Sequence, residues 1–319
     1  MKLEELYDFY REGKVPKRLC WQLTREGLLP LLDVQRLLQK NPACEEVLIR
    51  EDGIILQAKG IRLFFDMSQN ICRAEAILIG TESEEIALMT RFVPEGGIVF
   101  DIGANIGRVS LGLAKAHPDC TIYAFEPVEE TFHGMERNLA LNKEGERIKA
   151  YHMGFYSESG DLKFFVPAAN EAASLRPITD VYYLKEGDRG QGELKDHLEE
   201  VFCPVDTLDH FVKEHQITRM DFLKCDTEGA EKMVFGGGAH VFQKLRPVVY
   251  TEMLRKHAAR FDYHPNEIIE MFRGWGYSCH VAQDDKLVPF AEMDESTLET
   301  NFFFLHEEKH RELLAKYGG

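Results

Sequence analysis

The segment from Phe100 to Gly107, with the sequence FDIGANIG, constrains the fold of this chain more than any other. A continuous apolar run over Ile98–Ile102 leads into it, and apolar residues at helical spacing follow over Ile106–His117. Continuous apolar runs are typical of buried parallel strands. The glycines let the backbone turn tightly and approach a ligand, and the start of the following helix offers unpaired N–H groups. We therefore predict a strand, a ligand-binding loop and a helix in succession.

Strand-like and helix-like segments alternate along the rest of the chain, which predicts a mainly parallel sheet covered on both faces. Further strands are expected at Thr121–Phe125, Ile148–Phe155, Leu162–Val166, Met220–Cys225, Val248–Met253, Tyr277–Ala282 and Asn301–His306. Helices are expected over Val128–Leu139, Thr207–His215, Glu228–Leu245 and Pro265–Trp275. The last two strands are joined by a short non-helical link and should pair antiparallel. The predicted fold class is α/β, with a Rossmann-like, doubly wound sheet of order 3-2-1-4-5-7-6 whose last strand is antiparallel.

The first ninety residues precede this alternation and predict a separate N-terminal extension. Apolar residues recur at helical spacing over the first forty residues. Short β-like runs then cover Val47–Phe65, and Asp52-Gly53 is typical of a hairpin turn. We therefore expect a helical and small β extension at residues 1–90 and the main domain at residues 91–319.

Charge and composition narrow the choice of partners and compartment. The chain has 54 acidic and 38 basic residues and a net charge of -16, which disfavours a nucleic-acid partner. No apolar stretch approaches the roughly 18 residues that a membrane span needs, and the N-terminus lacks the apolar core of a signal peptide. The seven cysteines are scattered without a CxxC pair, so neither a disulfide framework nor a zinc site is expected. We expect a cytoplasmic protein that binds neither nucleic acid nor membrane.

A second functional element ends the next predicted strand, in the sequence YAFEP (123–127). Glu126 lies about twenty residues beyond the glycine loop, where a carboxylate can accept both hydroxyls of a ribose. Pro127 disfavours helical conformation at Glu126 and so keeps the acid at the strand tip. Together, loop and acid predict a nucleoside cofactor, and both NAD and S-adenosylmethionine meet this pattern.

The loop sequence favours S-adenosylmethionine over NAD. It reads Asp-x-Gly-x-Asn-x-Gly, whereas dinucleotide loops read Gly-x-Gly-x-x-Gly. Asn105 replaces a glycine at the place where the backbone would have to approach a pyrophosphate. Asp101 would lie close to the phosphates of a dinucleotide but suits the ammonium group of a methionine moiety.

Acids also follow the predicted strand Met220–Cys225, in the sequence CDTEGAE. The predicted order places this strand beside the one that ends at Gly103, at the point where doubly wound sheets bind ligands. Asp226 at the strand tip is therefore a candidate functional residue. Glu228 and Glu231 fit equally well as acids that cap the following helix.

Two further candidate bases follow the next predicted strand. Glu252 would line the acceptor side of the same crevice, and His257 lies a few residues later on what also reads as a surface helix. If the acceptor is an alcohol, methyl transfer requires removal of its proton, and we then expect Asp226 or Glu252 to act as general base with His257 in reserve. No metal is expected; if one binds, Mg²⁺ would be held by Asp226, Glu228 and Glu252.

Four other features flank the predicted crevice. Glu158 either reaches the amino group of an adenine or is a solvated turn residue. The segment Asn170–Ser174 is a candidate lining of the acceptor pocket. Lys224 either pairs with a neighbouring acid or extends its ammonium group toward solvent. The run Gly236-Gly237-Gly238 would loosen the helix that follows Asp226.

Taken together, these motifs resemble the FkbM family of S-adenosylmethionine-dependent methyltransferases. The similarity covers about half of the chain and rests on FDIGANIG (100–107), FEP (125–127), VDTLD (205–209), FLKCDTEGAE (222–231) and RPVVYTEM (246–253). It implies O-methylation of a hydroxyl on a sugar or another small natural-product-type acceptor. The cofactor contacts that the resemblance implies are Asp101, Gly103, Asn105, Gly107 and Glu126.

Two other functions are still open from the sequence. One is an NAD-dependent oxidoreductase of Rossmann type, and the other is a non-catalytic partner subunit with a methyltransferase-like fold. The expected partner is a small-molecule acceptor with a sugar or metabolite hydroxyl, and a homo-oligomer is compatible with the sequence.

Overall fold

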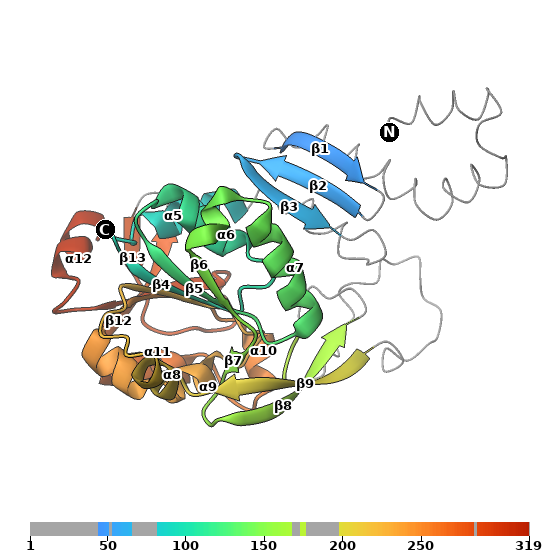
Figure 1. Ribbon diagram of the computed structural model, residues 1–319. Coiled ribbons are helices and arrows are strands. Elements are labelled where there is room, and N and C mark those ends of the chain that lie inside the picture. The colour runs from blue at the N-terminus through green and yellow to red at the C-terminus, as the bar shows by residue number, and fades with distance from the viewer. Residues whose placement is uncertain are drawn as a thin grey trace, which may run out of the picture. The chain divides into compact units, whose positions relative to one another are not determined.

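The computed structural model describes residues 44–50, 53–65, 82–167, 173–176, 198–283 and 286–318. The chain divides into two compact units, one ending at Glu85 and the other beginning at Ile86 (Figure 1). The helices predicted for the first forty residues lie outside the described residues. The predicted extension at residues 1–90 and the main domain at residues 91–319 stay predictions.

An antiparallel sheet of order β1-β2-β3 forms the described part of the first unit. Its strands are β1 (Cys44–Arg50), β2 (Gly53–Ala58) and β3 (Ile61–Phe65). Gly53 pairs with Arg50, so only two residues link β1 to β2. The β hairpin predicted from the Asp52-Gly53 signal is thereby confirmed.

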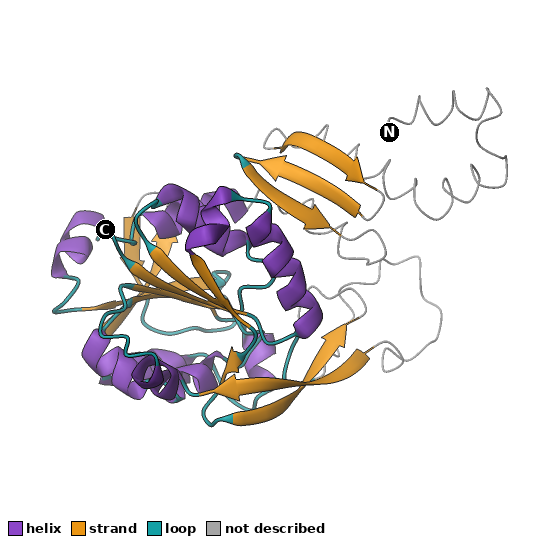
Figure 2. Cartoon of the chain, in the orientation of Figure 1, coloured by secondary structure: helices purple, strands orange, loops and turns teal. Residues whose placement is uncertain are grey.

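The second unit is built on an eight-stranded sheet of order β13-β12-β14-β11-β10-β4-β5-β6 (Figures 1 and 2). Its strands are β4 (Ile98–Ile102), β5 (Thr121–Phe125), β6 (Ile148–Tyr151), β10 (Phe222–Cys225), β11 (Val248–Glu252), β12 (Tyr277–Gln283), β13 (Lys286–Pro289) and β14 (Asn301–His306). Five neighbouring strands of this sheet, in the order β6-β5-β4-β10-β11, pair in parallel. β14 is antiparallel to both of its neighbours. This confirms the predicted order and the antiparallel last strand; β13 is an additional edge strand.

Helices cover both faces of this sheet, with α6 and α7 on one side and α8, α9 and α11 on the other (Figure 1). The helical segments are α5 (Glu82–Thr90), α6 (Arg108–Ala116), α7 (Glu129–Ala140), η2 (Lys143–Arg147), α8 (Leu208–Glu214), α9 (Glu231–Gly236), η5 (Val241–Leu245), α10 (Arg255–Ala259), α11 (Asn266–Gly274) and α12 (Arg311–Tyr317). Thr207 caps α8 by accepting the N–H of His210 at 3.1 Å, as a threonine at a helix start does. No helix in the described part of the chain is long and apolar enough to cross a membrane.

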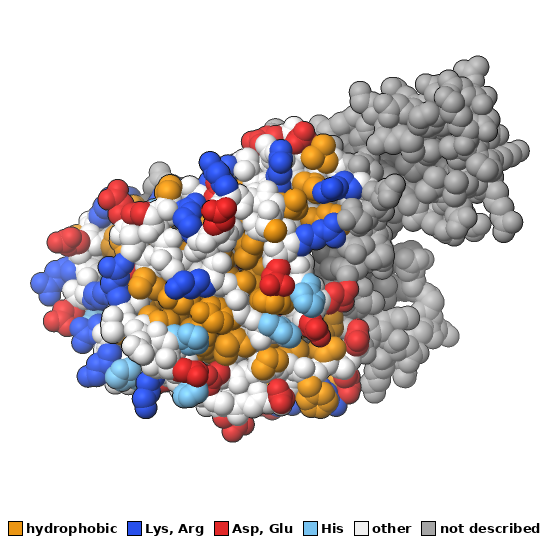
Figure 3. All heavy atoms as spheres, viewed as in Figure 1, with side chains coloured by type: hydrophobic (Ala, Val, Ile, Leu, Met, Phe, Trp, Pro, Cys, Tyr) orange, Lys and Arg blue, Asp and Glu red, His pale blue; other side chains and the backbone are white. Residues whose placement is uncertain are grey.

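Aromatic side chains fill the layer between the sheet and the second group of helices. The fully buried phenylalanines of this core include Phe100, Phe125, Phe211, Phe235, Phe242 and Phe272. Apolar side chains also gather on the surface between the two helical layers, bordered by histidine and acidic side chains (Figure 3). The apolar strand runs predicted from the sequence contribute their side chains to the buried core, which holds the strand ends in place.

The predicted strand Ile148–Phe155 is wrong in its second half. The carbonyl of Tyr151, the last residue of β6, accepts the N–H of Met153, and this tight turn ends the strand. The chain then enters a separate sheet of order β7-β9-β8. Its strands are β7 (Gly154–Phe155), β8 (Gly160–Pro167) and β9 (Leu198–Asp206).

The long helix predicted over Glu228–Leu245 is also wrong. α9 begins at Glu231 and ends at Gly236, and a short π-helical segment, η5, follows. At Gly237 a Cβ atom would lie 2.3 Å from the carbonyl oxygen of Tyr156, so the backbone packs too closely for any other residue. The glycine run, which was expected only to loosen this helix, interrupts it.

Candidate active site

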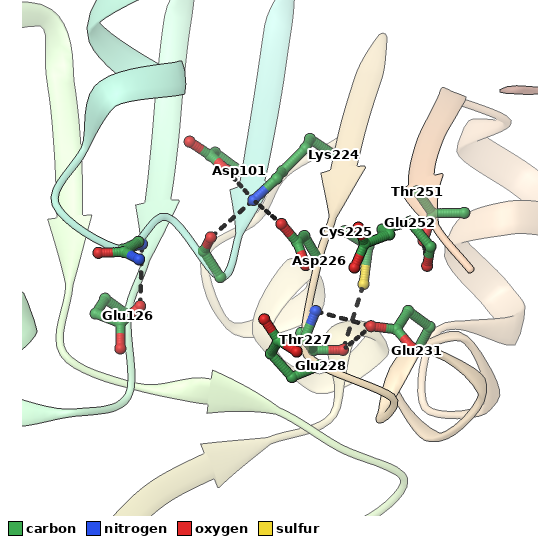
Figure 4. A network of polar contacts seen from close by, with 12 residues as sticks. Asp101, Glu126, Lys224, Cys225, Asp226, Thr227, Glu228, Glu231, Thr251 and Glu252 are labelled. Carbon is green, nitrogen blue, oxygen red and sulfur yellow. Dashed lines mark hydrogen bonds and ion pairs between the residues drawn. The ribbon is translucent and has the colours of Figure 1, made fainter. Parts of the chain in front are cut away.

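The carboxyl ends of β4, β5, β10 and β11 lie next to one another at one edge of the sheet. Ile102 of β4 pairs with Phe125 of β5 and with Cys225 of β10, so these strands end at the same level. The acids at the four strand ends are Asp101, Glu126, Asp226 and Glu252 (Figure 4). The structure therefore brings the predicted cofactor residues and the predicted bases to one edge.

The glycine loop takes the backbone conformation that its sequence predicts. Gly103, Asn105 and Gly107 have φ angles of 73°, 49° and 83°, in the left-handed region that glycine and asparagine tolerate best. A Cβ atom on Gly103 would lie 1.9 Å from the carbonyl oxygen of Asp226, and one on Gly107 would lie 2.9 Å from Met135 Cγ. The loop between β4 and α6 therefore packs directly against the end of β10 and the face of α7.

Glu126 is buried beneath this loop. Its Oε2 accepts the N–H of Asn105 at 3.0 Å and its Oε1 accepts the N–H of Val128 at 3.1 Å. Burial raises the pKa of Glu126 to about 7, although the same N–H groups act to lower it. An ionised carboxylate has about four lone-pair sites, so each oxygen can still accept another hydrogen bond. These two acceptor oxygens fit the two hydroxyl donors of a ribose.

Asp101 lies deeper than the sequence analysis expected. It is fully buried, its Oδ2 accepts the hydroxyl of Ser110 at 2.6 Å, and its Oδ1 lies 3.4 Å from Lys224 Nζ. The cation beside Asp101 is therefore a lysine of the chain itself. A direct contact between Asp101 and the ammonium group of a cofactor stays a prediction.

Lys224 connects the two central strands. Its Nζ donates to the carbonyl of Gly103 at 2.7 Å and lies 3.6 Å from Asp226 Oδ2 (Figure 4). Burial lowers the pKa of Lys224, but the charges of Asp226 and Asp101 outweigh it and raise the pKa above its ordinary value. Of the two roles left open for this lysine, the structure shows pairing with neighbouring acids. The side chain of Asp226 is 41% exposed, so this acid faces outward from the pair.

His257 of α10 lies between two carboxylates. Its Nδ1 is 3.2 Å from Glu228 Oε2 and 3.9 Å from Glu252 Oε2. Burial and the negative charges of Asp226 and Glu231 raise the pKa of Glu228 to about 8. An imidazole paired with a carboxylate is an arrangement that general bases use. The structure therefore places the reserve base at the centre of the acidic cluster and gives Glu228 a partner that the sequence did not reveal.

Glu231 faces the protein interior. Its Oε1 accepts the N–H and the hydroxyl of Thr227, at 2.8 and 2.9 Å, and the N–H of Gly229 at 3.2 Å. The side chain is buried, and burial raises its pKa although the backbone N–H groups oppose the shift. The N-cap residue of α9 is Ala230, so Glu231 binds the N–H groups of the loop before the helix and does not cap the helix itself.

Two other predicted site residues have different surroundings. Glu158 is exposed in the turn between β7 and β8, and its contact with adenine stays a prediction. Ser174 is buried, and its hydroxyl donates to the carbonyl of Glu228 at 3.3 Å. The described end of the segment proposed to line the acceptor pocket therefore lies against the acidic loop.

The three residues considered for Mg²⁺ are not gathered as a ligand set. Among the described residues, one group of three metal-ligand side chains has all its donor atoms within 4.8 Å, and it consists of Asp206, His210 and Glu214. In that group Asp206 Oδ1 already accepts the hydroxyl of Ser159 and the N–H of Thr207. One carboxylate oxygen of this second group therefore already has protein partners.

A comparison with protein families identifies the family of this chain. Residues 101–279 match the family model described as the Methyltransferase FkbM domain, which is more than half of the chain. The chain belongs to the FkbM methyltransferase family. As an FkbM methyltransferase it is an S-adenosylmethionine-dependent enzyme with a Rossmann-like fold. The NAD-dependent oxidoreductase and the non-catalytic partner subunit, both left open by the sequence, are thereby set aside.

Curated relatives of this FkbM methyltransferase come from bacteria and fungi. The 31-O-demethyl-FK506 methyltransferase FkbM of Streptomyces tacrolimicus is 27% identical over 213 residues, covering 63% of this chain and 79% of that protein. Methyltransferase 1 of Beauveria bassiana is 32% identical over 149 residues, covering 45% of this chain and 59% of that protein. The crystal structure of methyltransferase FkbM from Methylobacillus flagellatus aligns with a TM-score of 0.39 at 12% identity, covering 86% of this chain and 58% of that protein. The chain thus spans less than two thirds of the last two proteins.

Tyr263, which the structure places against the acidic loop, was not singled out from the sequence. The hydroxyl of Tyr263 lies 3.0 Å from the carbonyl oxygen of Gly229 and 3.4 Å from Glu231 Oε2. No motif marks this tyrosine, because it lies in the loop between α10 and α11 and reaches the acidic loop only through tertiary packing.

Proposed function

We propose that the chain transfers the methyl group of S-adenosylmethionine to a hydroxyl on a sugar or another small natural-product-type acceptor. The observation that carries this proposal is the imidazole of His257 held between Glu228 and Glu252 at the strand ends. A hydroxyl must lose its proton as it is methylated, and this cluster offers a base for that proton. The name of the Streptomyces relative indicates that it methylates an oxygen of a natural product.

The cofactor would be held by the loop after β4 and by the acid after β5. Glu126 would accept the ribose hydroxyls, and Gly103, Asn105 and Gly107 would let the cofactor approach the backbone. Glu158 would contact the adenine, and Asp101 would act on the methionine end through Lys224. When bound, the cofactor supplies an electrophilic methyl group on its sulfonium. The family relationship and the buried carboxylate of Glu126 support this assignment.

On the acceptor side, His257 and Glu228 would act as one proton-accepting pair. Nδ1 of His257 and Oε2 of Glu228 are 3.2 Å apart, close enough to share a proton. The raised pKa of Glu228, about 8, matches the range in which a group exchanges protons near neutral pH. Asp226 and Glu252, the bases first expected, would hold the acceptor and the imidazole in place.

Calorimetric titration with S-adenosylhomocysteine tests the cofactor assignment. We expect the wild type to bind and Glu126→Ala to lose most of the affinity while staying folded. A folded wild type that does not bind S-adenosylhomocysteine would remove the basis of the proposal.

A panel of matched alcohols, amines and carboxylic acids tests the acceptor class. The panel includes free sugars and 31-O-demethyl-FK506, the compound in the name of the Streptomyces relative. We expect methyl ethers from alcohols and a kcat lowered by about 10²–10⁴ in His257→Gln, with unchanged binding of S-adenosylhomocysteine. Methylation of amines alone would overturn the proposal of O-methylation.

A further inference from the structure

We propose that Glu231 and Tyr263 are positioning residues that fix the loop Thr227–Gly229 so that the carboxylate of Glu228 meets His257. The proposal rests on the function proposed above, in which Glu228 and His257 form the base. Of the two acids of this motif, Glu231 would position the loop, whereas Glu228 would take part in the base itself.

The conformation of this loop decides where the carboxylate of Glu228 lies. Glu228 has a φ of 55°, a left-handed conformation that a residue with a side chain adopts only when its surroundings impose it. Gly229 has a φ of 108°, and a Cβ atom there would lie 2.6 Å from the carbonyl oxygen of His257. The loop is therefore packed against α10, and a small change in its path changes the distance between Glu228 and His257.

Glu231 holds this loop from inside the protein. Its Oε1 accepts two backbone N–H groups, from Thr227 and Gly229, and these two residues flank Glu228 on either side. The hydroxyl of Thr227 donates to the same oxygen. One buried carboxylate oxygen thus binds the backbone on both sides of Glu228. Its contacts with Thr227 are drawn in Figure 4.

Tyr263 completes the support. Its hydroxyl is 3.0 Å from the carbonyl oxygen of Gly229 and 3.4 Å from Glu231 Oε2, and it donates to one of them at a time. Burial raises the pKa of this phenol above its ordinary value, so the hydroxyl keeps its proton and stays a donor. Ser174 donates to the carbonyl of Glu228, so each residue of the loop Thr227–Gly229 has a hydrogen-bonded backbone group.

Histidine-ring NMR on the full chain with bound S-adenosylhomocysteine tests the proposal. The protein carries ¹⁵N-labelled histidine, and His257→Gln assigns the resonance. We expect Glu228→Gln to shift the ring nitrogens of His257, and Tyr263→Phe and Glu231→Gln to shift them in the same direction. In the Glu228→Gln background, Tyr263→Phe should add almost nothing, because its effect acts through Glu228.

Turnover with a hydroxyl acceptor gives the second measurement. A misplacement of about 1 Å can cost about 10²-fold, so we expect Tyr263→Phe to lower kcat by roughly 10–100-fold with unchanged affinity for S-adenosylhomocysteine. The matched control is Tyr277→Phe, which removes a buried hydroxyl that donates to the carbonyl of Phe242 at 3.2 Å, away from the loop. This control should leave both kcat and the His257 resonance unchanged.

The outcomes separate this proposal from the one on which it rests. If Glu228→Gln lowers kcat and shifts the His257 resonance, but Tyr263→Phe and Glu231→Gln act independently of it, the positioning role is overturned and the base stands. If Glu228→Gln changes neither quantity, the proposed base is wrong and the positioning role fails with it. Non-additive effects on both measurements support the proposal.

Discussion

Lys224 is the residue whose replacement should affect stability most clearly. Its side chain is only 9% exposed, and it lies beside the fully buried carboxylate of Asp101. Replacement by methionine keeps much of the volume but leaves Asp101 buried without a cation. Removing one partner of a buried ion pair costs about 3–5 kcal/mol, because the other charge is left uncompensated. The contact with Asp226 adds little, since that carboxylate is partly exposed and solvent screens it.

The loss of Lys224 should therefore be visible in equilibrium unfolding. For a unit of this size each kcal/mol changes Tm by roughly 2–4 °C, so Lys224→Met should lower Tm by about 6–20 °C. Lys163→Met is the matched control, because Lys163 pairs with Glu200 at 2.7 Å on the surface, with both side chains about half exposed. An exposed pair of this kind contributes about 0–1 kcal/mol.

A double variant shows whether the uncompensated charge is the cause. Lys224→Met with Asp101→Asn removes both charges, and the amide oxygen can still accept the hydroxyl of Ser110. Replacing a buried pair by neutral groups is often close to neutral in stability, so most of the loss should be recovered. The reasoning is refuted if Lys224→Met unfolds within about 1 kcal/mol of the wild type, or if the double variant is no more stable than Lys224→Met alone.

Three other predictions follow from the cofactor side of the site. Because burial raises the pKa of Glu126 to about 7, the folded protein keeps a proton that the unfolded chain releases from about pH 4.5 upward. The free energy of unfolding that this group contributes should therefore fall as the pH rises from about 4.5 to about 7. Urea unfolding at several pH values should show that the free energy of unfolding depends less steeply on pH in Glu126→Gln than in the wild type. Gly103→Ala places a Cβ atom 1.9 Å from a backbone oxygen and should abolish binding of S-adenosylhomocysteine in calorimetry. The control Gly236→Ala meets no atom within 4 Å and should bind normally. Glu158→Ala should weaken the same binding if this exposed carboxylate contacts adenine, and an unchanged affinity would remove it from the site.

The strands of the main sheet could be predicted closely, because burial on both faces leaves a continuous apolar run. The observed bounds of β4, β5 and β14 equal the predicted ones. β9 was missed, because its sequence LEEVFCPVD mixes charged residues and a proline into the apolar pattern. Its strand conformation depends on pairing with β8, which lies about forty residues away in the sequence.

The candidate site was predicted where it depends on strand ends and missed where it depends on packing between distant segments. The strand order placed Asp226 beside Gly103 without any structure. The pairing of Lys224 depends on register, since this residue lies directly opposite Asp101 on the neighbouring strand. The pairing of His257 with Glu228 depends on the close packing of α10 against Gly229, and no spacing in the sequence encodes that contact.

Burial divides the site into two halves that should respond differently to mutation. On the proposed cofactor side, Asp101, Glu126 and Lys224 are buried and bonded to backbone or to one another, so their geometry is set by the sheet and the glycine loop. On the proposed acceptor side, Glu228 and Glu252 keep about a quarter of their side chains exposed. A ligand can reach these two carboxylates without rearrangement of the core. Changes on the first side should therefore alter cofactor binding whatever the acceptor, whereas changes on the second should alter turnover and acceptor choice while the cofactor still binds.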